Sequence, residues 1–266
     1  MHNFITSTLQ LGRKVSMVLW LIDQYTSLGC NEDITVYLNE RPASFQRKAG
    51  GYLVFSDLEE DQFRVSIESP YYFTEQLEIS LSSLNRSEPV VYVPLKPAPQ
   101  YRFNPGATLI RASLCDNNGE PVSCSLIATL NSNDCARAKL GRQGAKAGAS
   151  EISLVDTTGR MAPGDLLLIR PQEAKSGEVC EITTMGVGEG VYSLKQPLLT
   201  DHSRGELLMP VTITRSDERG ESVIGLRNPR QKTSRIQIEF SFGDRNHIVE
   251  VDAATGLTHH LGKIML

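Results

Sequence analysis

Apolar and polar residues alternate with period two along most of this chain. Clear examples are residues 34–38, 62–67, 77–81 and 235–240, where every second side chain is apolar. Successive side chains of a strand point to opposite faces, so this pattern predicts half-buried antiparallel strands. Helical periodicity is nearly absent, and the predicted helical segments are short, around residues 133–139 and at the extreme N-terminus.

Polar turns that contain glycine separate the strands at short intervals. They occupy residues 48–51, 116–119, 156–159, 186–190 and 242–244. Many short strands joined by such turns are typical of sandwiches and small barrels. We therefore predict an all-β fold of tandem small β-sandwich and β-barrel domains.

Two changes in composition mark domain boundaries. Three prolines, Pro94, Pro97 and Pro99, favour an extended connector and end a first domain, residues 1–97. A run of small residues around 141–150 precedes a third domain, residues 145–210. Residues 98–144 between them form either a small sandwich or an extension of a neighbour, and strands after Pro210 form a C-terminal β unit, residues 211–266.

Residues 49–58 form a glycine-aromatic strand and an "F-x-D-L" turn, and residues 63–72 form a strand of alternating aromatic and β-branched residues. With these features the first domain resembles the transthyretin-like fold of carboxypeptidase regulatory-like domains. The physical basis of the resemblance is that two apolar side chains can staple the turn and that three alternating ones line a sandwich core. These residues are Phe55 and Leu58 in the turn and Phe63, Val65 and Ile67 in the core. Such domains are appended to proteins of many functions.

Residues 150–209 contain a pattern that begins at Pro163-Gly164-Asp165 and ends with His202 and Gly205. This pattern is similar to a small β-barrel module of phage tail and tail-like particle proteins. We expect Pro163-Gly164 to make a tight turn that Asp165 caps, and His202 with Gly205 to fix the turn before the last strand.

Composition excludes several classes of protein. The chain of 266 residues is 40% hydrophobic and 22% charged, with a net charge of −4. These values are ordinary for a globular protein, and no apolar run approaches the roughly 18 to 20 residues that cross a bilayer. No region is basic enough for a nucleic-acid footprint. The densest basic cluster, interpreted as a solvated face rather than an anion site, is Arg215, Arg219, Arg227, Arg230, Lys232 and Arg235.

The sequence contains no convincing catalytic, cofactor or metal site. An odd number of cysteines without a CxxC pair indicates neither a disulfide framework nor a zinc site; they are Cys30, Cys115, Cys124, Cys135 and Cys180. Cys124 fits a small buried residue of a strand.

Isolated polar residues suggest chemistry only weakly. His202, beside Asp201 and with Asp165 in reach, suggests a base or a metal ligand, but a turn histidine bonded to backbone is the commoner case. Neighbours on a strand point to opposite faces, so His259 and His260 do not share an ion easily. A hydrolase triad selected from the chain lacks a nucleophile elbow; its members are Ser216, Asp217 and His247.

Aromatic residues offer an alternative binding chemistry. The run Tyr71-Tyr72-Phe73 suggests a stacking platform for a sugar or a partner, although alternate members are expected to fill the sandwich core. Tyr52 and Trp20 are further candidates for sugar stacking.

Architecture and resemblance together favour a non-catalytic structural or binding component of a bacterial phage-tail-like particle, such as a contractile injection system. Its place is the baseplate, a fibre attachment or the particle end, and its partners are other tail or baseplate proteins, with a trimer or hexamer in the assembly. The alternatives are a carbohydrate-binding adhesin and a hydrolase of unknown specificity. After Arg13 and Lys14 the apolar run is short and lacks a cleavage site, so we expect a cytoplasmic protein until assembly, without membrane insertion or a cofactor.

Overall fold

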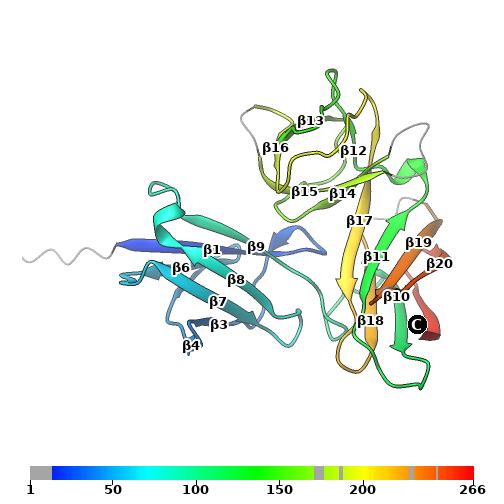
Figure 1. The fold of residues 1–266 in the computed structure, drawn as a ribbon, viewed down its shortest axis with the longest axis horizontal. Coiled ribbons are helices and arrows are strands. Elements are labelled where there is room, and N and C mark those ends of the chain that lie inside the picture. Colours follow the sequence, from blue (N-terminus) through cyan, green and yellow to red (C-terminus); the bar gives the residue numbers. More distant parts are fainter. Residues whose placement is uncertain (1–13, 171–176, 186–187, 228–230, 244) are drawn as a thin grey trace, which may run out of the picture.

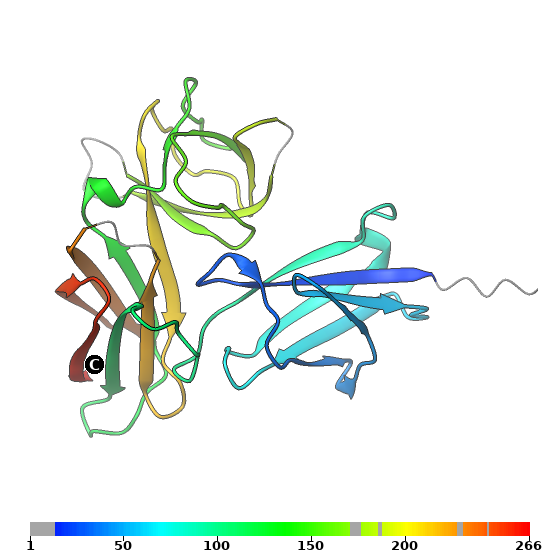
Figure 2. The same ribbon diagram turned by 180° about the vertical axis from the view of Figure 1, so that it is seen from behind.

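The computed structural model describes residues 14–170, 177–185, 188–227, 231–243 and 245–266. These residues form an all-β structure in which the helical elements are two 3-10 turns, η1 (Leu81–Ser83) and η2 (Asn133–Cys135). The predicted all-β class is confirmed. Figures 1 and 2 show the first sandwich beside a second β sandwich, with a small barrel against both. No helix in the described part of the chain is long and apolar enough to cross a membrane.

The first sandwich consists of two sheets packed face to face. One sheet has the order β2-β1-β6-β5, with β9 parallel to β1, and the other has the order β4-β3-β7-β8. The strands of the first sheet are β1 (Val15–Asp23), β2 (Leu28–Gly29), β5 (Gln46–Lys48), β6 (Tyr52–Ser56) and β9 (Val90–Leu95). Those of the second are β3 (Thr35–Leu38), β4 (Arg41–Pro42), β7 (Gln62–Glu68) and β8 (Glu75–Ser80).

The alternating residues predicted for this core are buried. Phe63, Val65 and Ile67 of β7 face the interior, and Phe55 of β6 is completely buried in the same core. Leu58 is half-buried and packs against that core. The apolar run that begins at Val15 forms β1, which pairs with β2, β6 and β9.

The barrel closes on itself through six strands. Their order is β12-β13-β16-β15-β14-β17, and β12 also pairs with β17. The strands are β12 (Ala138–Leu140), β13 (Glu151–Val155), β14 (Leu166–Arg170), β15 (Glu178–Met185), β16 (Val191–Leu194) and β17 (Leu207–Arg215). Closure removes the open edges that a sheet of this size would otherwise expose.

The second sandwich combines strands from both sides of the barrel. One sheet has the order β18-β10-β21, and the other continues the barrel from β17 through β11 and β19 to β20. The strands are β10 (Thr108–Cys115), β11 (Ser125–Leu130), β18 (Glu221–Leu226), β19 (Thr233–Phe242), β20 (Arg245–Ala254) and β21 (Thr258–Met265). Strands β10 and β11 of residues 98–144 thus join the C-terminal strands in this sandwich, whereas β12 of the same segment belongs to the barrel, which is inserted between β11 and β17.

The helix predicted for residues 133–139 is wrong. The 3-10 turn η2 occupies Asn133–Cys135, and the chain then enters β12, where buried Ala138 and Leu140 flank exposed Lys139. Asn133 and Asp134 favour turns over helix, and the barrel core requires strand alternation directly after them. The predicted N-terminal helix lies outside the described residues.

Candidate functional site

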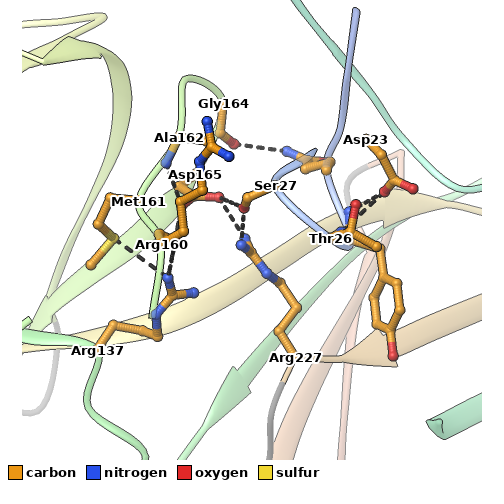
Figure 3. Close-up of polar contacts among 12 residues, drawn as sticks. Asp23, Thr26, Ser27, Arg137, Arg160, Met161, Ala162, Gly164, Asp165 and Arg227 are labelled. Carbon is orange, nitrogen blue, oxygen red and sulfur yellow. Dashed lines mark hydrogen bonds and ion pairs between the residues drawn. The ribbon is translucent and has the colours of Figure 1, made fainter. Parts of the chain in front are cut away.

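A buried polar junction joins the two sandwiches and the barrel, and Figure 3 shows it in close-up. Its centre is Asp165, which precedes β14 and is 2% exposed. Ser27 of the first sandwich donates its hydroxyl to Asp165 Oδ1 at 2.8 Å. Arg227, which follows β18, donates through Nη1 to the same oxygen at 2.5 Å and through Nη2 to Ser27 Oγ. One carboxylate therefore binds side chains of both sandwiches.

The second carboxylate oxygen of Asp165 serves the barrel itself. Oδ2 accepts the backbone N–H of Ala162 at 3.0 Å, the turn-capping role predicted for Asp165. The Arg137 guanidinium lies 4.0 Å from the same oxygen and also donates to the carbonyl of Arg160 at 2.6 Å. A buried charge is tolerated only when it is paired and hydrogen-bonded, and these groups supply both conditions.

Close packing of the Gly164 backbone on the Pro94 ring completes the junction. Gly164 has a φ of +87°, which only glycine adopts without strain, and a Cβ there would lie 2.3 Å from Pro94 Cγ. Gln24 donates its side-chain amide to the Gly164 carbonyl at 3.1 Å. The predicted Pro163-Gly164 turn thus packs directly on the proline-rich connector.

A second buried carboxylate anchors the connector to the first sandwich. Asp23, at the end of β1 and 5% exposed, accepts the Tyr72 hydroxyl at 3.0 Å and the Tyr101 hydroxyl at 2.5 Å on the same oxygen. Burial, followed by the nearby Asp23 charge, raises the pKa of Tyr72. Burial and the hydrogen bond to Asp23 raise the pKa of Tyr101. Both phenols are therefore neutral donors, and Tyr72 is a core residue instead of a stacking platform.

A cavity of about 580 Å³ opens on the barrel beside β15. At its wall His202 lies between two carboxylates, with Nδ1 2.8 Å from Glu206 Oε2 and Nε2 3.0 Å from Glu178 Oε2. Glu178 also accepts the backbone N–H groups of Leu199 and Thr200, at 2.6 and 3.1 Å. Burial alone would raise the pKa of Glu178, but its bonds to Leu199, His202 and Thr200 lower it overall.

The partners expected for His202 are not the ones it has. Asp201 binds Lys146 at 2.8 Å, and Asp165 belongs to the junction. His202 also exchanges backbone hydrogen bonds with Ala145, so it fixes its turn as expected for a turn histidine. Sequence reasoning missed Glu178 and Glu206. Glu206, four residues after His202, was detectable by its spacing, whereas Glu178 reaches the site only through barrel closure.

The other candidate catalytic and metal residues are engaged elsewhere. Ser216 donates its hydroxyl to the Val122 carbonyl at 2.8 Å, and Asp217 binds Arg219 at 3.1 Å. His247 is exposed on β20, and its ring lies 6.4 Å from that of Phe240. The three triad candidates share no contact among the described interactions. His259 binds the Ala254 carbonyl at 3.2 Å, and the described residues contain no cluster of three potential metal ligands.

The cysteines are buried and unpaired in the described structure. Burial raises the pKa of Cys180, which borders the barrel cavity, to about 12. Since the thiolate is the reactive form, a thiol with this pKa is a poor nucleophile near neutral pH. Cys124 is a small buried strand residue, as predicted.

Each remaining aromatic candidate has at least one ring face covered. Trp20 stacks on Tyr52 with centroids 5.1 Å apart and an angle of 17° between the rings. Arg102 lies 4.3 Å from the centre of the Tyr71 ring, and Arg215 lies 4.7 Å from the centre of the Phe73 ring. These pairings are aromatic and cation–π contacts within the protein. They leave the sugar-binding alternative without a supporting observation.

The predicted solvated basic face is wrong for Arg227. This arginine is directed into the junction, whereas Arg219 and Arg235 are exposed and pair with nearby carboxylates. Arg230 lies outside the described residues. Charge density in the sequence does not distinguish these cases, because the partner of Arg227 is 62 residues away.

Comparison with known proteins gives no family. No family model and no curated protein matches the chain. Among solved structures, two variants of the shaft pilin SpaA from Lactobacillus rhamnosus GG are similar at 13% and 12% identity, covering 94% and 95% of this chain and 96% of each of theirs. Their TM-scores are 0.24 and 0.23, too low to carry any argument about fold or function.

Proposed function

We propose that this protein is a non-catalytic structural component of a bacterial phage-tail-like particle, positioned at the baseplate, a fibre attachment or the particle end. The observation that carries the proposal is the junction around Asp165. It binds Ser27 of one unit and Arg227 of another. A buried ionic link between domains suits a subunit that must keep a fixed shape while it is held by its neighbours.

The chemistry of the described polar residues supports the same assignment. His202, in the loop before β17, bonds to both Glu178 and Glu206, and Cys180, which lines the same cavity, has a raised pKa. Two resemblances are the reason for proposing a phage-tail-like particle. Residues 1–97 resemble carboxypeptidase regulatory-like domains, and residues 145–210 resemble a barrel of tail proteins. In this proposal the first sandwich is a docking module, and the barrel and second sandwich are the body of the subunit.

Co-sedimentation tests the proposal. The full chain is tagged in its native host, particles are induced, and a density gradient separates assembled particles from free protein. We expect the chain in the particle fraction with sheath, tube or baseplate proteins, whose genes should neighbour its own. Free protein alone in the light fractions, with no such neighbouring genes, would refute the proposal. A glycan array with specific binding lost on Tyr71→Ala would support the adhesin in its place.

A further inference from the structure

The outermost strand of the second sandwich, β20, has one free edge. It pairs with β19 over all ten of its residues, from Arg245 to Ala254, without a register shift. In the described part of the chain it pairs with no second strand. Figures 1 and 2 show β20 in orange-red at the margin of the molecule, away from the first sandwich.

The free edge carries unpaired backbone groups at even-numbered residues. In an antiparallel ladder, alternate residues bond to the neighbouring strand. The Thr255 N–H donates to the Lys232 carbonyl at 2.9 Å, so odd-numbered residues of this hairpin bond to β19. The N–H and C=O groups of Asn246, Ile248, Glu250 and Asp252 consequently point away from the sheet.

This edge lacks several of the features that normally block strand pairing. Proteins protect edges with proline, bulges, short strands or charged side chains, especially lysine. β20 contains no lysine, and its charged residues are Arg245, Glu250 and Asp252. The β9 edge contains Pro94 and the β5 edge is three residues long, whereas β20 has ten residues, no proline, no glycine and no bulge. One of its outward side chains is Ile248, which is 56% exposed. A long, regular and partly apolar edge is a site for the addition of another strand.

We infer that β20 pairs antiparallel with β20 of a second copy of this chain, about a two-fold axis at Ile248. A two-fold axis perpendicular to the sheet keeps the even-numbered side chains of both copies on one face. The two residue numbers of each pair across the axis therefore add up to an even number. The axis at Ile248 sets Ile248 against Ile248 and Asn246 against Glu250. Apolar groups then meet at the centre, and an amide faces each carboxylate.

The same register keeps the Glu250 carboxylate away from the Glu250 carboxylate of the second copy. Glu250 lies across from Asn246 of the second copy, so it does not face its own counterpart. Arg235 of β19 lies 3.9 Å from Glu250 and 3.4 Å from Asp252 and offsets their charge. Inward-facing Val249 and Val251 pack against the core and hold β20 in its register. The edge of β20 is therefore held in a fixed conformation for strand pairing. The dimer does not depend on the proposed role in a particle.

Light scattering coupled to size exclusion, applied to the full chain over a series of concentrations, tests this dimer. We expect a dimer that dissociates on dilution and its loss in Ile248→Pro, because proline removes an N–H that β19 does not use and blocks the edge. Leu199→Ala is the matched control, since Leu199 is 83% exposed on the barrel and its loss should leave the dimer intact. A wild-type monomer throughout, or a dimer that persists in folded Ile248→Pro, would overturn the inference.

Cysteine cross-linking tests the register without relying on proline. Ile248→Cys places the two thiols opposite each other, and the described native cysteines are buried. Mild oxidation should give a covalent dimer. Val155→Cys, on a barrel strand paired on both sides and 42% exposed, should stay monomeric on denaturing gels. Equal cross-linking of the two variants would contradict the inference.

Discussion

Replacing Arg227 by methionine should break the junction while keeping much of the side-chain volume. The variant leaves Asp165, whose side chain is 3% exposed, without its closest cation. Removing one partner of a buried ion pair costs about 3–5 kcal/mol. Arg137 at 4.0 Å and the Ser27 and Ala162 donors remain, so we expect the lower end, about 3 kcal/mol of unfolding free energy.

Denaturant unfolding with two probes measures the loss of unfolding free energy and shows which unit loses it. Trp20 is the only tryptophan and reports on the first sandwich by fluorescence, whereas far-UV circular dichroism reports on all strands. The transitions should coincide in the wild type and separate in Arg227→Met, because the junction no longer couples the units. Asp165→Asn combined with Arg227→Met should lose less stability than the two single losses added together.

The matched control is Arg219→Met, which removes an exposed arginine that pairs with Asp217. Exposed ion pairs contribute little to stability, so this variant should unfold like the wild type. If Arg227→Met also unfolds like the wild type, or if the double variant shows simple additivity, the junction does not hold the units together.

Three further changes test other parts of the structure. Gly164→Ala introduces a Cβ 2.3 Å from Pro94 Cγ at a φ of +87°, and thermal unfolding should show a loss of about 1–3 kcal/mol; unchanged stability would show that the turn and connector do not pack as described. Thr214→Val removes a buried hydroxyl that has no partner in the described structure, so urea unfolding should show a gain of about 1 kcal/mol, and a loss would indicate that the hydroxyl is bonded. The pKa of Glu178 is lowered from 4.5, so the stability it contributes is present above that value and is lost as pH falls through the folded pKa. Glu178→Gln should flatten this acid dependence of the unfolding free energy, and an unaltered slope would argue against the contact with His202.

The sequence predicted the local structure of this protein because local structure depends on nearby residues. Alternation at 62–67 predicted both β7 and its buried face, and Gly164 with Asp165 predicted a capped turn. The helix predicted at residues 133–139 was wrong, because packing in the barrel core favours a strand directly after the turn.

The tertiary structure decided which distant residues meet. Asp165 finds Ser27 and Arg227 at separations of 138 and 62 residues, and Glu178 finds His202 across 24. No periodicity encodes such contacts, since they depend on sheet order, barrel closure and the insertion of one unit in another. The sequence thus determined strands, turns and the all-β class. The junction and the free edge of β20 followed only from the way those strands pair, because hydrogen-bond partners in a sheet are chosen by the whole fold.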